Sequence, residues 1–262
     1  MDLDLRRARE VGIQAARSAG EILRRRVDSI HDIRHKGVID IVTEVDLESE
    51  KKVCDTLLSA FPGHSILGEE GGARAGGDPR FRWIVDPLDG TTNYAHGFPF
   101  FCVSIALEVD RRIVLGVAYA PSLDELFVAQ AGDGATVNDR PIQVSSTDDL
   151  EQALLATGFP YDRADFSRAL RSFEVISLQS QAVRRAGSAV LDLCYVACGR
   201  LDGYWEHVVK PWDVAAGALI VREAGGRVTG AEGSPFDVDA GHILASNGVL
   251  HRPMSAALAG RQ

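Results

Sequence analysis

The spacing of apolar residues along the chain predicts helices first and then a sheet. Residues 3–28 place small apolar side chains at helical spacing opposite a charged face, which is typical of an amphipathic helix. A second helix is expected from Asp40 to about Phe61, and Ser65-Ile66-Leu67 reads as a short apolar strand. Turn residues separate the next apolar and β-branched runs, which predict an antiparallel meander over 101–109, 113–120 and 125–129.

The pattern changes in the second part of the chain. Short apolar strands there alternate with helical stretches, as in Leu154-Leu155-Ala156 before a helix expected over 164–178. Further helices are expected over 188–198 and from Pro211 to Gly225, with a strand over 201–206 between them. Alternation of this kind is typical of α/β proteins.

The length of 262 residues suits one large domain or two closely packed halves. We expect an α+β half over residues 1–150 and an α/β half over residues 151–262, joined in one compact unit. The first residues lack the apolar core of a signal peptide, and no stretch approaches the length of a membrane span. The chain is therefore not expected to act at a membrane.

The stretch from Trp83 to Asn93 combines a buried strand with two carboxylates and a glycine turn. We expect the strand to end at Asp86, because Pro87 restricts the residue before it and has no N–H. The chain then turns at Asp89-Gly90, and the following residues suit a helix start whose free amides face the same corner. Such a corner offers oxygen ligands to a hard cation. The alternative is a simple Asp-Gly hairpin with solvated aspartates.

Other acidic residues stand where a strand ends or a helix begins, and each has a structural explanation of its own. Asp46 follows Thr43 by three residues, as in a capping box. Glu69 lies at the end of a short strand, where a glutamate is usually surface charge. Asp213 falls in the first turn of the helix that Pro211 opens, where a carboxylate faces the positive end of the helix dipole.

Further segments are candidates for contact with a ligand. Ser188 suits a helix N-cap, but this helix start beside Arg184-Arg185 could also hold a hydroxyl-rich or anionic ligand, and either capping or ligand binding explains Ser188. Glu206 ends an apolar strand and, if buried, would need hydrogen-bond partners such as sugar hydroxyls. Lys36 either meets a phosphate or only solvates a loop. The glycine-rich stretch from Gly71 to Pro79 predicts a surface loop, either a lid or, as we favour, a connection.

Composition narrows the partners and the compartment. The formal net charge of −9 argues against nucleic acid or an anionic membrane as the main partner, because both attract basic surfaces. A phosphorylated substrate would then need a local basic cluster or bound cations. Four cysteines without paired spacing are typical of reduced thiols in a cytoplasmic protein. Cys194 and Cys198 are spaced for one edge of a metal site, although tight packing of small side chains explains them more simply.

Four acidic motifs follow one another in order along the chain. They are D-x-V-T-x-x-D over 40–46, G-E-E over 68–70, D-P-L-D-G-T-T-N over 86–93 and W-D-x-A-A-G over 212–217. Together they resemble the signatures of the inositol monophosphatase family, and the resemblance runs from Asp40 through Gly226, particularly to the bacterial inositol-1-monophosphatases. It implies a layered α-β-α-β-α fold, of the type shared with fructose-1,6-bisphosphatase, and a homodimer.

The resemblance also implies Mg²⁺ as cofactor, with two or three ions in each site. One ion would be held by Glu69, Asp86, the Leu88 carbonyl and Asp89. A second would be held by Asp86, Asp89 and Asp213. Among the catalytic residues, Glu69 would act with the metals, while Thr91 and Asp46 would orient or deprotonate the attacking water.

The same resemblance implies a small phosphorylated polyol as substrate. The amides of Gly90 and Thr91 would receive phosphate oxygens. The hydroxyls of inositol would be held by Glu206 and by the segment Gly187, Ser188 and Ala189. Leu88, Asp89 and Asp213 would also contact the substrate. The implied reaction is hydrolysis of myo-inositol 1-phosphate to inositol and phosphate by a metal-activated water.

Two alternatives stay open at this stage. Phosphatases of the same superfamily hydrolyse fructose 1,6-bisphosphate, histidinol phosphate or adenosine 3′,5′-bisphosphate, and only the pocket for the leaving group distinguishes them. Glu206 favours a polyol, whereas a nucleotide would need aromatic stacking surface that the sequence does not clearly offer. A protein that keeps the fold but only binds another macromolecule would have little physical reason to keep clustered carboxylates.

Overall fold

The computed structural model describes residues 4–27, 34–35, 41–160, 162–231 and 233–260. The helices are α1 (Leu5–Arg26), α2 (Glu44–Ala60), α3 (Thr91–Ala95), α4 (Arg163–Ser177), α5 (Ala189–Ala197), α6 (Pro211–Glu223) and α7 (His251–Leu258), with a 3-10 turn at Leu150–Gln152. The strands are β1 (Arg34–His35), β2 (Ile41–Val42), β3 (Ser65–Gly68), β4 (Gly72–Arg74), β5 (Phe81–Asp89), β6 (Cys102–Val109), β7 (Arg112–Ala120), β8 (Glu125–Gln130), β9 (Gly134–Val137), β10 (Arg140–Pro141), β11 (Leu154–Thr157), β12 (Ala182–Arg184), β13 (Gly203–Glu206), β14 (Arg227–Thr229) and β15 (Ile243–Ser246).

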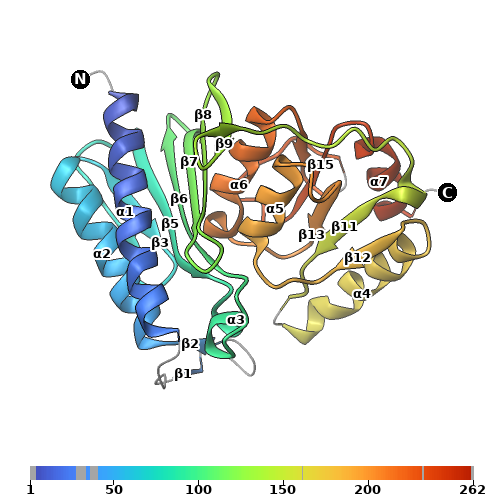
Figure 1. Ribbon diagram of the computed structural model, residues 1–262, viewed down its shortest axis with the longest axis horizontal. Coiled ribbons are helices and arrows are strands. Elements are labelled where there is room, and N and C mark those ends of the chain that lie inside the picture. The colour runs from blue at the N-terminus through green and yellow to red at the C-terminus, as the bar shows by residue number, and fades with distance from the viewer. Residues whose placement is uncertain (1–3, 28–33, 36–40, 161, 232, 261–262) are drawn as a thin grey trace.

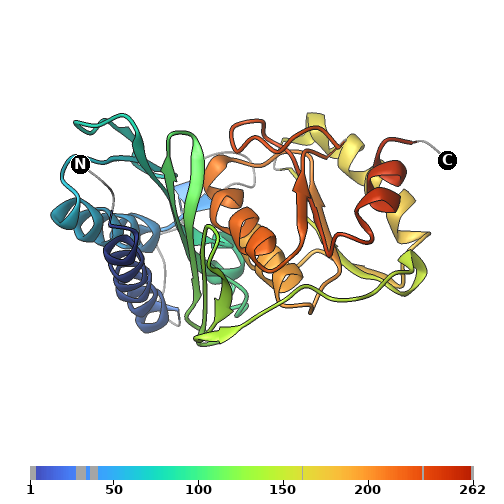
Figure 2. The same ribbon diagram turned by 90° about the horizontal axis from the view of Figure 1, so that it is seen from above.

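The elements form five layers, as the resemblance implied. An eight-stranded sheet, in the order β10-β9-β8-β7-β6-β5-β3-β4, is covered by α1 and α2 on one face and by α5 and α6 on the other (Figures 1 and 2). A five-stranded sheet, β12-β11-β13-β15-β14, packs on the far side of α5 and α6 and carries α4 and α7 on its outer face. Three hydrophobic clusters fill the space between successive layers.

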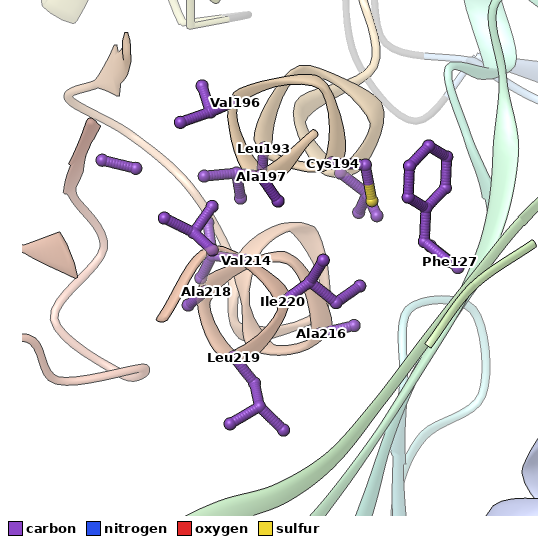
Figure 3. Packing of buried hydrophobic residues seen from close by; sticks show 14 of the residues in the cluster. Phe127, Leu193, Cys194, Val196, Ala197, Val214, Ala216, Ala218, Leu219 and Ile220 are labelled. Atoms are coloured by element: carbon purple, nitrogen blue, oxygen red, sulfur yellow. The ribbon is translucent and has the colours of Figure 1, made fainter. Parts of the chain in front are cut away.

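Small residues allow the central helices to pack closely. Figure 3 shows α5 and α6 side by side, with Phe127 of β8 beside them. A Cβ on Gly217 would stand 2.6 Å from the Leu193 side chain, and a Cβ on Gly116 would stand 2.7 Å from the backbone oxygen of Ala216. The Ala-Ala-Gly run after Asp213 is therefore explained by contact with a neighbouring helix and with β7. This packing fixes the start of α6 against the large sheet.

Several expected boundaries are confirmed and others are wrong. The strand at Trp83 does not end at Asp86: β5 continues to Asp89, with a register shift between those two residues where it pairs with β6. Proline is tolerated at such a bulge because the ladder is already interrupted there. Within the glycine-rich stretch, β4 pairs with β3 as an edge strand, so part of the expected loop is regular structure.

The second half is also less purely α/β than its pattern predicted. Strands β12, β11 and β13 are parallel, but β15 runs antiparallel to both β13 and β14. No helix separates β14 from β15 in the chain, which permits this antiparallel return. Among the described helices, none combines the length and the apolarity needed to cross a membrane.

Candidate active site

The bulge in β5 places its carboxylates at the C-terminal end of this inner strand of the large sheet. Asp86 is 2% exposed, and its Oδ1 accepts a hydrogen bond from the Leu88 amide at 3.0 Å. The Ser49 hydroxyl of α2 donates to the Pro87 carbonyl at 2.8 Å and fixes the bulge from the next layer. Asp86, Leu88 and Asp89 are thereby held in one short, buried segment.

The carboxylate of Asp46 serves both a helix start and the β5 corner. Its Oδ2 accepts hydrogen bonds from the amide and the hydroxyl of Thr43, at 2.9 and 2.5 Å, which completes the predicted capping box of α2. The Thr91 hydroxyl lies 3.1 Å from the Oδ1 of Asp46 and 3.0 Å from the Leu88 carbonyl oxygen. The structure thus brings Thr91 and Asp46 together, as the resemblance implied.

Asp89 joins the two halves of the chain at this corner. Its Oδ2 accepts hydrogen bonds from the Ser188 hydroxyl at 2.5 Å and from the Val190 amide at 2.8 Å, both at the start of α5. Gly90, which follows, has φ +98° and would bring a Cβ within 3.3 Å of the Gly187 carbonyl. Only glycine suits that conformation and that gap.

The remaining acidic positions come from separate elements. Asp213, half-buried in the first turn of α6, accepts a hydrogen bond on Oδ2 from the Lys210 amide at 2.6 Å. Glu69 follows β3, and its backbone amide donates to the Val85 carbonyl of β5 at 3.2 Å. The next amide, of Glu70, donates to the buried Glu50 carboxylate of α2 at 2.8 Å. These contacts hold the Glu69 backbone beside the β5 corner.

These carboxylates lie close enough to raise one another's pKa values, so they share one site. Burial raises the pKa of Asp86 well above its ordinary value, and the negative charges of Glu69, Asp89 and Asp213 raise it further. Burial likewise raises the pKa of Asp213. The pKa of Asp89 rises to about 6 through burial, although the Ser188 hydroxyl and two amides oppose the change. Clustered carboxylates with raised pKa values are typical of functional sites.

A cleft of about 450 Å³ opens beside the cluster. Of the predicted site residues, those that line it are Glu69, Asp89, Gly187, Ser188, Ala189, Glu206 and Asp213. The other predicted residues do not line the cleft but belong to the hydrogen-bonded corner at the end of β5. They are Asp46, Asp86, Leu88, Gly90 and Thr91. Lys36 and Asp40 lie outside the described residues.

The donor set fits a hard divalent cation. Carboxylate and carbonyl oxygens are the ligands that Mg²⁺ prefers, and the buried negative charges on Asp86 and Asp89 need compensation. On Asp86 and Asp213 the hydrogen bonds from described residues fall on a single oxygen, so the second oxygen is open to a ligand. As the described side chains stand, no three histidine, cysteine, aspartate or glutamate groups already surround one ion.

Two cleft residues were not predicted from the sequence. Asp192 of α5 and Tyr204 of β13 are buried and line the cleft, and the Tyr204 hydroxyl donates to Glu206. Their sequence pattern is that of ordinary helix and strand residues, so only the folded chain distinguishes them. Arg185, which the sequence indicated as a candidate contact for a hydroxyl-rich or anionic ligand, also lines the cleft. The cleft also has aromatic surface, from Phe159, Tyr204 and Trp212, which the sequence did not clearly offer.

A layered α-β-α-β-α fold with a buried acidic corner beside a cleft is typical of phosphatases that cleave small phosphate esters. The chain belongs to the inositol monophosphatase family, whose model matches residues 4–261. An inositol-1-monophosphatase of Synechocystis is 46% identical over 258 residues, which cover 98% of this chain and 90% of the relative.

Two further relatives widen the comparison. The structure of an inositol monophosphatase from Anabaena has a TM-score of 0.90 at 43% identity, covering 98% of this chain and 97% of that one. A Vibrio cholerae protein named Nus factor SuhB is 43% identical over 240 residues, which cover 90% of each chain. The family therefore contains proteins named for phosphatase activity and proteins named for another role.

Proposed function

We propose that the chain is a Mg²⁺-dependent phosphomonoesterase that hydrolyses myo-inositol 1-phosphate to inositol and phosphate. The observation that carries the proposal is the convergence of carboxylates from β5, α6 and the end of β3 beside one cleft that Glu206 also lines. The clustered carboxylates, with bound cations, suit the phosphate end of the substrate, and Glu206 suits its hydroxyl groups.

The acidic corner would hold the cations. Glu69, Asp86, Asp89, Asp213 and the Leu88 carbonyl provide oxygen ligands for two or three ions. When bound, Mg²⁺ would neutralise the phosphate and favour ionisation of the attacking water. The net charge of −9 is compatible with a phosphate ester for that reason.

The chain's own residues would orient the reacting groups. The Thr91 hydroxyl, placed between the Asp46 carboxylate and the Leu88 carbonyl, can accept a hydrogen bond from the water while it donates to Asp46. Asp46 Oδ1 would then receive the proton, because its Oδ2 is already engaged by Thr43. The amides after Asp89 would receive phosphate oxygens, and Glu206 would accept hydrogen bonds from the polyol.

The proposal includes a homodimer working in the cytoplasm. The family resemblance supports the dimer. The four cysteines support the compartment, because all of them are free thiols and three are buried.

Two other functions compete with this one. The metal corner would serve equally for fructose 1,6-bisphosphate, histidinol phosphate or adenosine 3′,5′-bisphosphate, and the aromatic cleft residues give a nucleotide some support. A role in binding another macromolecule is the second candidate, because a relative at 43% identity is named a Nus factor.

Phosphate release from a substrate panel tests the proposal. Purified protein with Mg²⁺ is given inositol 1-phosphate, fructose 1,6-bisphosphate, histidinol phosphate and adenosine 3′,5′-bisphosphate, and kcat/KM is compared. We expect kcat/KM to be highest for inositol 1-phosphate. If another ester leads, the assignment of Glu206 to a polyol fails while the acidic corner stands. If none is cleaved, the macromolecular role becomes the first candidate.

A further inference from the structure

Asp192 is a buried carboxylate that has no role in the proposed binding of cations, phosphate or inositol. It belongs to the first turn of α5, is 2% exposed and lines the cleft. Among the described residues, no hydrogen bond or ion pair reaches its carboxylate. Its oxygens are not among the enclosed side-chain atoms that lack a partner, so they reach the cleft, where a ligand can contact them. Largely buried carboxylates are usually hydrogen-bonded, because desolvation without a partner is costly.

The start of α5 does not supply the missing donors, although the helix dipole there favours a negative charge. The Val190 amide donates to Asp89, and the Leu191 amide donates to the Ser188 hydroxyl. The amide of Asp192 itself donates to the Ser188 carbonyl. Every amide in this turn that could cap the Asp192 side chain therefore has another acceptor.

Neighbouring negative charges make the ionised form of Asp192 still less favourable. Burial raises the pKa of Asp192 well above its ordinary value, and the charges of Asp89 and Glu206 raise it further. Arg185 opposes the shift, but no ion pair joins the two side chains. Two acidic groups from different elements, Asp192 and Glu206, thus face the same cleft with little compensation.

The neighbouring wall holds Glu206 in one position. The Tyr204 hydroxyl donates to its Oε2, and Gly158 leaves space for it, because a Cβ there would stand 2.2 Å from that oxygen. Tyr204 is fully buried, so this arrangement is built into the fold. The cleft therefore presents hydrogen-bond acceptors to whatever enters beside the acidic corner.

We propose that Asp192 is a second hydroxyl acceptor of the cleft and that, with Glu206, it selects phosphate esters whose alcohol carries neighbouring hydroxyl groups. The inference rests on the proposed function and deepens it. A polyol supplies the donors that Asp192 lacks within the chain. An alcohol without hydroxyls leaves the carboxylate desolvated and unpaired, and a second phosphate group places negative charge beside it.

Two substitutions at Asp192 test the assignment. Asp192→Leu removes both acceptor oxygens at similar size, and Asp192→Asn keeps one of them. The readout is the ratio of kcat/KM for inositol 1-phosphate to kcat/KM for phenyl phosphate, which lacks hydroxyl groups. We expect the ratio to fall tenfold or more in Asp192→Leu and by a smaller factor in Asp192→Asn. The Tm of Asp192→Asn should not fall, because an unpaired buried charge is removed.

Asp202→Asn is the matched control. Asp202 is also buried, but it lies outside the cleft and accepts hydrogen bonds from the Ser145 hydroxyl at 2.5 Å and the Leu154 amide at 2.7 Å. This variant should lower the Tm and leave the substrate ratio unchanged. A binding role changes the substrate ratio without lowering the Tm, as expected at Asp192. A structural role lowers the Tm without changing the ratio, as expected at Asp202.

The failure of this inference can be distinguished from the failure of the proposed function. A ratio within twofold of wild type in Asp192→Leu, or a Tm loss in Asp192→Asn equal to that of Asp202→Asn, overturns the role of Asp192. If wild-type protein cleaves neither ester, the proposed function fails. Calorimetric binding of inositol 1-phosphate then decides the inference: binding tenfold weaker in Asp192→Leu supports it, and equal binding overturns it.

Discussion

At the residue scale, carboxylates of the acidic corner have structural roles beside the chemical roles that we propose for them. Asp213 accepts from the amide at the start of its helix, and Asp46 completes a capping box while it contacts Thr91. Each position had a plausible structural explanation in the sequence, and the structure shows that this explanation holds. Because the hydrogen bonds with described residues fall on only one oxygen of Asp213, the same side chain remains available to a ligand.

The residues that the sequence did not reveal are those whose environment is made by tertiary contact. Asp192 reads as one acidic position in a helix, and Tyr204 reads as a strand residue of ordinary β propensity. Their burial near Glu206 arises because α5 and β13 pack against each other beside the cleft. No local spacing predicts that approach, whereas motif positions such as Asp86 and Asp89 carry their signal in adjacent residues.

Thr91 provides the residue-scale prediction. Thr91→Val keeps the shape of the side chain but removes the hydroxyl between Asp46 and the Leu88 carbonyl, so kcat should fall about 100-fold or more with little change in KM. Steady-state kinetics on inositol 1-phosphate measures both. Thr92→Val, the same change at the next and exposed position, should keep near wild-type kcat. A change confined to KM would rule out the relay role of Thr91.

At the element scale, most helix and strand bounds lie within two residues of those predicted, but the helix expected from Asp40 begins at Glu44, after the short strand β2. The helix expected over residues 3–28 is α1, and its buried side has the small residues that the periodicity indicated. The strand at Trp83 was predicted too short, because Pro87 was expected to stop it. A local rule for proline cannot show that the partner strand offers a bulge at that place. Edge strand β4 was missed because glycine-rich sequence usually indicates a loop.

The contact between β7 and α6 gives a prediction for packing. Gly116→Ala would push a Cβ to 2.7 Å from the backbone oxygen of Ala216, so α6 must shift. We expect the free energy of unfolding in urea to fall by about 1–3 kcal/mol, as in other overpacked cores. Gly63→Ala is the control, since a Cβ there has no neighbour within 4 Å. Equal stability of the two variants would contradict this close contact.

His251, at the start of α7, gives a prediction for pH. Burial, together with the charge of Arg227, lowers its pKa to about 4. Its Nε2 lies 2.9 Å from the Thr229 hydroxyl, which already donates to the Gly230 carbonyl, and its Nδ1 lies 2.9 Å from the Ser246 hydroxyl. The neutral ring with a proton on Nε2 satisfies both contacts.

Because the unfolded chain takes up this proton near pH 6.5 and the folded chain only near pH 4, stability present above pH 6.5 is lost as the pH falls between those values. Between pH 7 and pH 5 the wild type should lose about 2 kcal/mol more than His251→Gln. Urea unfolding at both pH values measures the difference. Parallel losses in the two proteins would show that His251 is not the group responsible.

At the scale of the whole molecule, the layered fold explains why the acidic corner exists. The proposed cation ligands come from the large sheet, the residue that follows β3 and α6, while the proposed hydroxyl-binding residues come from α5 and the second sheet. The motifs indicated residues that the structure brings together at this corner, because their order and spacing match a known family. How the two sheets share α5 and α6, and therefore the aromatic and acidic lining of the cleft, depends on packing between distant segments.

The proposal that the acidic corner holds Mg²⁺ for hydrolysis is best tested by the Mg²⁺ dependence of the variant Asp213→Asn. The variant keeps the size of the side chain and an oxygen for the Lys210 amide, but removes the charge that α6 contributes to the corner. Phosphate release from inositol 1-phosphate is measured against Mg²⁺ concentration, with exposed Asp133→Asn as control. We expect turnover in Asp213→Asn to fall at least tenfold and half-maximal activity to need more Mg²⁺. Unchanged turnover at low Mg²⁺ would contradict the account.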